Sequence, residues 1–171
     1  MAPAESPETA GGHSRRSKPA RIWVAYVLGT WFGFGYTPYA PGTAGTIGAV
    51  PLYLLLRPCG LPAVLGAALA LTVVGIWAAS IVATDTGLKD PQIVVIDEVA
   101  GVLCTLAVAP GAWTGVIVGV VLFRVFDQWK PWPARAAERR LPGGYGIVLD
   151  DIAAGAWGAA VMLGLRVTHV L

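Results

Sequence analysis

The stretch from Leu61 to Ala83 limits how this chain can fold more than any other, because none of its 23 residues is charged. An apolar run of about 20 residues is long enough to cross a bilayer as an α-helix. Further apolar runs lie on either side of it, and only 13% of the residues in the chain are charged, about half the share usual in a soluble domain. We therefore expect an all-α fold, a compact multi-helix membrane bundle, with a soluble helical bundle as the alternative.

Six apolar segments are expected to be helical, and stretches rich in Pro, Gly or charge separate them. The first is short for a complete span and could equally be an interfacial helix. The segment 35–46, GYTPYAPGTAGT, is too rich in Pro and Gly for regular structure to be expected. The expected helices cover residues 22–34, 47–56, 61–83, 93–109, 112–129 and 152–171.

Residues 1–21 are rich in Pro, Ser, Gly and charge, which predicts a disordered basic tail in front of a single helical domain, residues 22–171. The basic run HSRRSKPAR has no interleaved aromatic residues, so we expect a solvated tail and no nucleic-acid partner. Cys59 and Cys104 belong to no CxxC pair, which excludes a typical zinc site or disulfide framework. The sequence does not indicate an oligomeric state.

Alternating membrane crossings would bring three polar segments, 37–46, 85–98 and 124–151, to one face of the bundle. The short turns at 57–61 and 110–111 would then lie on the opposite face. Most Lys and Arg residues outside the tail fall on the first face, and cytoplasmic loops are enriched in such residues. We therefore expect a multi-pass protein of the inner cell membrane whose polar loops converge on the cytoplasmic side.

The hairpin around residues 110–111 predicts one contact. Asp97 and Glu98 stand 13 and 12 residues before Pro110, and Arg124 stands 14 after it. At about 1.5 Å rise per residue, Arg124 should lie level with the acidic pair. Ionisable residues inside a membrane are usually functional. A purely structural ion pair that fixes the hairpin would also place Arg124 level with the two acidic residues.

Two further groups extend this site. Arg124, Asp127 and Lys130 are spaced i, i+3, i+6, which places them along one helix face. Asp150 and Asp151 are expected to open the last helix, where one of them would act as an N-cap and the other would be free for another role.

The carboxylates are the candidate catalytic residues and the candidate metal ligands. Oxygen ligands from several segments suit Mg²⁺, and no His is suitably placed for Zn²⁺. Arg124, Lys130 and Arg135 are the candidate phosphate-binding side chains. Thr43 and Gly144 are added because the Gly-rich runs APGTAGT and LPGGYGI offer backbone N–H groups to an anion. The candidate ligands are Asp97, Glu98, Asp127, Asp150 and Asp151.

Four motifs in this order, GYTPYAPGTAGT, VVIDEVAG, FRVFDQWKPWPAR and GGYGIVLDDIAAG, resemble the phosphatidylglycerophosphatase A family. The resemblance runs from about Gly29 to the end of the last expected helix. It implies an all-helical, Mg²⁺-dependent membrane enzyme that removes the terminal phosphate of phosphatidylglycerophosphate, a phosphorylated glycerophospholipid, to give phosphatidylglycerol. Whether water or a carboxylate attacks phosphorus stays open.

Two other functions remain as alternatives. A small membrane transporter or channel could use the charged residues as an ion path, but its charges would spread through the membrane depth instead of gathering on one face. Another Mg²⁺-dependent lipid-phosphate enzyme is also conceivable, although the CDP-alcohol phosphotransferase signature DGxxAR…GxxxDxxxD is absent from the chain.

Overall fold

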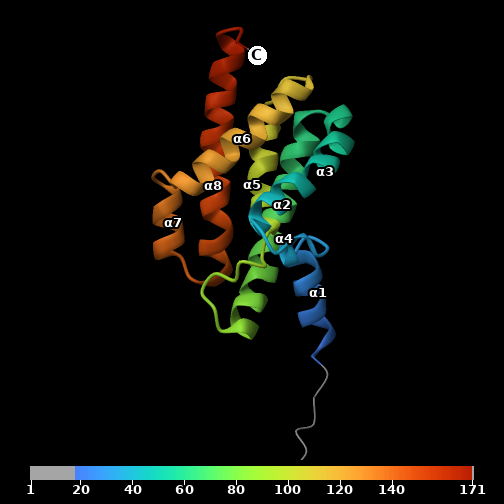
Figure 1. Ribbon diagram of the computed structural model, residues 1–171, viewed down its shortest axis with the longest axis vertical. Coiled ribbons are helices and arrows are strands. Elements are labelled where there is room, and N and C mark those ends of the chain that lie inside the picture. Colours follow the sequence, from blue (N-terminus) through green and yellow to red (C-terminus); the bar gives the residue numbers. More distant parts are fainter. Residues whose placement is uncertain (1–17, 171) are drawn as a thin grey trace, which may run out of the picture.

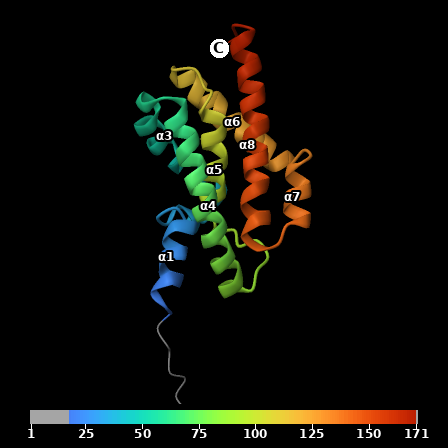
Figure 2. The same ribbon diagram turned by 180° about the vertical axis from the view of Figure 1, so that it is seen from behind.

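The computed structural model describes residues 18–170, and over these residues the protein is helical without strands, as the sequence predicts (Figure 1). The long helices run along the long axis of the molecule, with α1 and the C-terminus at opposite ends (Figures 1 and 2). The helices are α1 (Ala20–Gly29), α2 (Pro41–Gly48), α3 (Val50–Leu56), α4 (Leu61–Thr86), α5 (Ile96–Leu106), α6 (Trp113–Trp129), α7 (Ala134–Arg140) and α8 (Gly143–Val167), with short 3₁₀ turns η1 (Phe34–Tyr36) and η2 (Arg57–Cys59).

Helix α5 is the centre of the bundle. Nine of its eleven residues are buried, and it packs against α4, α6, α8 and α2. A helix that is buried on all sides belongs to a core, so neighbouring helices can hold its first turn firmly. That first turn carries Asp97 and Glu98.

Two glycines let α5 and α8 approach closely. A Cβ atom on Gly155 would lie 2.2 Å from the carbonyl oxygen of Gly101, so only glycine fits at this crossing. Thr105 adds a hydrogen bond across it, donating from Oγ1 to the Gly155 carbonyl at 3.0 Å. Because Asp97 and Asp151 each stand four residues before one of these glycines, both project one helical turn from the crossing.

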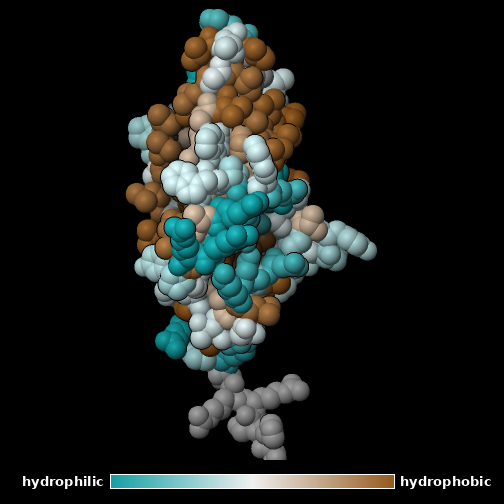
Figure 3. All heavy atoms as spheres, turned by 90° about the vertical axis from the view of Figure 1, so that its left-hand side faces the viewer, coloured by the Kyte–Doolittle hydropathy of each residue, from teal (hydrophilic) through white to brown (hydrophobic). Residues whose placement is uncertain are grey.

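The outward face of α6 is apolar along the whole helix, and that of α4 is apolar from Leu61 to Trp77. Exposed hydrophobic residues recur at every fourth position on both helices, which aligns them in two stripes. Helices α4 and α8 are long and apolar enough to cross a membrane, and Figure 3 shows hydrophobic residues over much of the upper part of the molecule, below the hydrophilic tip. The stripes consist of Leu61, Leu65, Leu69, Val73 and Trp77 on α4, and of Trp113, Ile117, Val121, Val125 and Trp129 on α6.

The two Gly-rich segments are more regular than expected. The prediction of irregular structure up to Thr46 is wrong, because α2 begins at Pro41, a residue well suited to the first helical turn. The prediction that Asp150 and Asp151 open the last helix is also wrong, since α8 begins at Gly143. The two aspartates lie in its second and third turns, so neither is an N-cap.

Tertiary packing explains the early start of α8. A Cβ atom on Gly144 would lie 2.2 Å from the carbonyl oxygen of Ile76 on α4, and the Gly144 N–H donates to Ser80 Oγ at 3.1 Å. This close approach to α4 compensates for the low helix propensity of the GGYG segment. The predicted disordered tail, residues 1–21, is too long by two residues, because α1 begins at Ala20. Residues 1–17 of that prediction lie outside the described residues.

Candidate active site

A cavity of about 240 Å³ lies where the three polar segments meet. It is bounded by the start of α2, the loop before α5, the first turn of α5, the end of α6 and the first half of α8. The three segments that the sequence places on one face therefore line a single cavity. Its walls are formed by Ala40, Pro41, Gly42, Asp90, Gln92, Val94, Asp97, Glu98, Arg124, Asp127, Lys130, Ile147, Asp150 and Asp151.

Three carboxylates form the floor of this cavity. One oxygen atom each of Asp97, Glu98 and Asp151 lies within 4.8 Å of the others. Asp97 and Asp151 are buried, and the close α5–α8 crossing sets the spacing between them. Adjacent buried carboxylates repel one another unless a cation or protons neutralise them, so this arrangement requires positive charge.

Arg124 supplies part of that charge from α6. Its Nη1 atom lies 2.7 Å from Oδ2 of Asp127 and 3.9 Å from Oε1 of Glu98. The hairpin geometry predicts the proximity of Arg124 to the acidic pair, and the structure shows it. The first contact is an ion pair without the alignment of a hydrogen bond, so Nη1 and Nε have no hydrogen-bond acceptor among the described residues.

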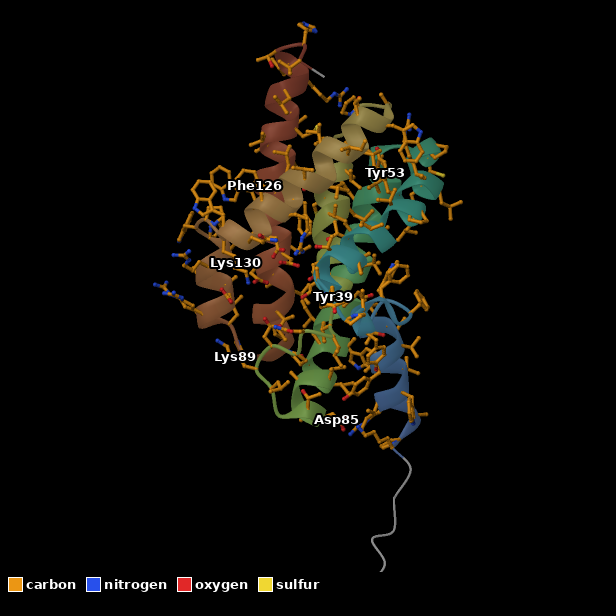
Figure 4. All side chains as sticks on the ribbon, in the orientation of Figure 1. Tyr39, Tyr53, Asp85, Lys89, Phe126 and Lys130 are labelled. Carbon is orange, nitrogen blue, oxygen red and sulfur yellow. The ribbon has the colours of Figure 1, made fainter. Side chains whose placement is uncertain are left out.

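Lys130 ends α6 in a left-handed backbone conformation, with φ of 48°. Its Nζ atom donates to Oδ2 of Asp150 at 2.6 Å and lies 3.3 Å from Oε1 of Glu138 on α7. Burial alone would lower the pKa of Lys130, but the hydrogen bond to Asp150 and the neighbouring carboxylates raise it above the ordinary value. Lys130 is therefore a permanent cation on the cavity wall (Figure 4).

The unpaired polar atoms test whether a cation fits the carboxylates. Oε2 of Glu98 is buried and has no hydrogen-bond donor among the described residues, and such a group costs free energy unless a ligand pairs with it. Oxygens on opposite sides of one Mg²⁺ stand about 4 Å apart, so atoms within 4.8 Å of one another need only small shifts to share an ion. The residues present fit Mg²⁺.

Seven of the ten candidate residues line the cavity together, and three do not. Arg135 lines a neighbouring groove. Gly144 packs on α4, and Thr43 is absent from the cavity wall, where its neighbour Gly42 stands. The seven that line it are Asp97, Glu98, Arg124, Asp127, Lys130, Asp150 and Asp151.

The sequence does not single out the other seven cavity residues, of which Gly42, Asp90 and Gln92 matter most for the site. A Cβ atom on Gly42 would lie 2.1 Å from Oε1 of Glu98, so this glycine admits the carboxylate against the α2 backbone. The APGTAGT motif indicates the segment but not which residue makes the contact. Asp90 and Gln92 come from the loop before α5, where no motif marks them. Asp90 is solvent-exposed overall, yet partial desolvation at the cavity raises its pKa.

Comparison with known proteins identifies the family of the chain. The sequence model of the family described as phosphatidylglycerophosphatase A matches residues 27–166, a range that contains every cavity residue. The chain belongs to the phosphatidylglycerophosphatase A family. As a member it is a phosphatidylglycerophosphatase, that is, a phosphoric monoester hydrolase, so the prediction of an enzyme is confirmed.

Individual relatives support the assignment to the phosphatidylglycerophosphatase A family. Phosphatidylglycerophosphatase A of Escherichia coli K12 is 36% identical over 153 residues, covering 86% of this chain and 85% of the relative. Its namesake in Haemophilus influenzae is 31% identical over 143 residues, 82% of this chain and 88% of the relative. A candidate phosphatidylinositol-3-phosphatase of Bacteroides thetaiotaomicron is 40% identical over 143 residues, covering 79% of this chain and 89% of the relative. No solved structure matches the chain.

Proposed function

We propose that the protein hydrolyses phosphatidylglycerophosphate to phosphatidylglycerol and inorganic phosphate at a membrane surface, and that it requires Mg²⁺. The observation that carries the proposal is the cavity itself. Three carboxylates whose oxygens lie within 4.8 Å of one another face an arginine with unpaired N–H groups. Carboxylates alone would repel a phosphate, and the arginine alone would not explain the acidic floor, but a divalent cation and a phosphate together neutralise both.

Mg²⁺ would be held by Asp97, Glu98 and Asp151, where it supplies Lewis-acid polarisation of the phosphoryl oxygens. The Nε and Nη1 groups of Arg124 have no hydrogen-bond acceptor among the described residues. They would donate to the non-bridging oxygens, on which negative charge gathers during phosphoryl transfer. Asp127 holds Arg124 in place through their 2.7 Å ion pair. The attacking oxygen belongs either to water deprotonated by a carboxylate or to a carboxylate itself.

Lys130 forms the second cationic wall. Its hydrogen bond to Asp150 fixes the ammonium at the edge of the cavity, where it adds positive charge beside the bound phosphate. A cation that is already in place needs no reorganisation during the reaction, which is the main source of electrostatic catalysis. Asp150 therefore serves in this proposal as a positioning residue for Lys130 and borders the metal ligands.

The apolar stripes support a location within the membrane. The α6 stripe begins at Trp113 and ends at Trp129, and these 17 residues rise about 24 Å from first to last. Trp is enriched at both interfaces of a bilayer whose core is about 30 Å thick. The stripes would then contact lipid, and the cavity would lie near the Trp129 interface of a multi-pass inner-membrane protein.

Charge orients this arrangement. Lys89 and the α7 arginines lie on the cavity side, whereas Arg57 and Arg166 lie near the opposite end of the helices. Because cytoplasmic loops carry the excess of Lys and Arg, the cavity would open to the cytoplasm.

The names of the relatives indicate a class of substrate. Phosphatidylglycerophosphate and phosphatidylinositol 3-phosphate are both glycerophospholipids whose headgroup carries a phosphate monoester in addition to the phosphodiester. We propose this shared chemistry as the substrate class, with phosphatidylglycerophosphate preferred because two of the three relatives carry its name.

Phosphate release by the purified full-length protein tests the proposal. In detergent with phosphatidylglycerophosphate, inorganic phosphate should appear with Mg²⁺ and stop with EDTA. Asp97→Asn should lower turnover at least about 100-fold, since it removes a proposed metal ligand, whereas Asp85→Asn, outside the cavity, should not. Absence of release refutes the activity, and release that persists in EDTA refutes the metal requirement.

A further inference from the structure

A groove of about 390 Å³ adjoins the active-site cavity. It is formed by the end of α6, the loop that follows and one face of α7. Lys130 lines both the groove and the cavity, so the two adjoin at this residue. Figure 4 places Lys130 below Phe126 on the α7 side of the molecule.

The groove is strongly cationic. Arg135 and Arg139, at i and i+4, share a face of α7 and line the groove together with Arg140. Ala134, the first residue of α7, is buried against the rest of the bundle. Among the described residues none of the three arginines pairs with a carboxylate, because Glu138 on α7 pairs with Lys130.

The helix dipole accounts for part of this pattern. It favours arginines in the last turn of a helix, which explains Arg139 and Arg140. Arg135 is the second residue of α7, where the dipole disfavours a cation, and its Nη2 donates only a long hydrogen bond of 3.4 Å to the Trp129 carbonyl. An anion in the groove would neutralise all three guanidinium groups.

Two tryptophans line the groove together with these arginines. Trp129 and Trp132 are 63% and 78% exposed. Phe126 stacks on Trp129 with ring centres 6.2 Å apart and on Trp157 at 6.1 Å, and Trp157 Nε1 donates to the backbone carbonyl of Trp132 at 3.0 Å. Exposed indoles suit the region of a bilayer where glycerol and headgroups meet.

We infer that this groove binds the phosphodiester of the substrate lipid while the active-site cavity holds its terminal phosphate monoester. The inference rests on the proposed function and deepens it. The two phosphates of such a headgroup are joined by a short polyol, so their binding sites must adjoin, as the groove and the cavity do across Lys130. The arginines of α7 thereby select a headgroup that carries both phosphates.

The decisive variant is Arg139→Gln/Arg140→Gln in the full-length protein, assayed in mixed micelles. Its KM for phosphatidylglycerophosphate should rise by at least about five-fold, roughly the effect of one arginine on binding to an anionic lipid surface. Its kcat and its inhibition by inorganic phosphate should stay unchanged, because the cavity is intact. Inhibition by phosphatidylglycerol, which has the diester but no monoester, should weaken in parallel with KM.

Two control variants sharpen the comparison. Arg21→Gln removes an exposed arginine of α1 that lines neither site and should leave KM unchanged. Arg139→Lys/Arg140→Lys keeps the charge and should recover most of the affinity. An unchanged KM in the glutamine variant, or an equal weakening of inorganic phosphate, overturns the inference. So does an equal rise in KM for phosphatidic acid, which has only a monoester and would reveal a general docking effect.

Direct binding separates this inference from the proposed function. If the wild-type protein releases no phosphate, the proposed function fails. Native mass spectrometry with phosphatidylglycerol then tests lipid binding in the groove independently of catalysis. Wild-type protein should retain more phosphatidylglycerol than the glutamine variant. Equal retention overturns the inference.

Discussion

Replacing Gly155 by alanine tests whether the α5–α8 crossing sets the geometry of the carboxylates. The added Cβ would lie 2.2 Å from the Gly101 carbonyl oxygen and 3.1 Å from Cys104 Cβ. Both neighbours belong to α5, and the nearer is backbone, so no flexible side chain can move aside. To reach an ordinary contact of 3.4 Å, α8 must retreat from α5 by about 1.2 Å at this point.

The retreat should reach the active site almost undiminished. Asp97 and Asp151 lie one turn from the crossing, about 5.4 Å along the helices. Their oxygens already lie up to 4.8 Å apart, against about 4 Å for ligands on opposite sides of one Mg²⁺. A misplacement of about 1 Å can cost on the order of 100-fold in rate, so we expect a loss of that size in kcat and a higher Mg²⁺ concentration for half-maximal activity.

Gly164→Ala is the matched control, because it makes the same change in the same helix at a position with no atom within 4 Å. It should keep full activity. Overpacking in Gly155→Ala should also cost about 1–3 kcal/mol of stability, so thermal melts by circular dichroism must show that the variant is folded at the assay temperature. A folded Gly155→Ala protein with normal kcat and normal Mg²⁺ dependence would refute the reasoning.

Three further predictions address other parts of the structure. Gly42→Ala should lower activity at least about 10-fold, since its Cβ would lie 2.1 Å from Oε1 of Glu98. Steady-state kinetics check this, and a normal rate would show that α2 can shift away from Glu98 without loss of activity. The pKa of Asp90 is raised by partial desolvation, so its contribution to stability is present in acid and lost as the pH rises through that pKa. Asp90→Asn should therefore raise Tm at pH 7 by no more than about 2 °C and leave it unchanged near pH 3, and a lower Tm at pH 7 would contradict this. Native Cys59 is exposed and should react with an impermeant thiol reagent from the side opposite to Leu88→Cys; labelling of both from one side would overturn the proposed topology.

Local geometry explains which site residues could be predicted from the sequence. Residue counts alone place Arg124 level with the acidic pair Asp97 and Glu98, because helical rise is nearly constant, and Arg124 does form an ion pair with Glu98 at 3.9 Å. The i, i+3, i+6 spacing likewise placed Asp127 and Lys130 on the cavity wall with Arg124. Both arguments need only a helix and a short turn, which apolar periodicity and Pro–Gly pairs reveal.

Predictions about the glycine-rich segments were less successful, because their conformation depends on distant partners. The GGYG segment is helical because Gly144 packs against Ile76 on α4, a contact between residues far apart in the chain. In APGTAGT, the residue that meets Glu98 is Gly42 and not Thr43, since the orientation of α2 over α5 decides which side of the helix faces the cavity.

Composition and helical periodicity are enough to predict that the chain is helical, and that most charges outside the N-terminal tail gather in two segments, 85–98 and 124–151. Those two segments contain the carboxylates, the arginine and the lysine of the cavity. The spacing of the carboxylates follows from tertiary packing, because the absence of side chains at Gly101 and Gly155 sets the distance between α5 and α8. Tertiary packing also decided that α7 lays its arginines beside the cavity, since α7 packs against α8 and Lys130 ion-pairs with Glu138.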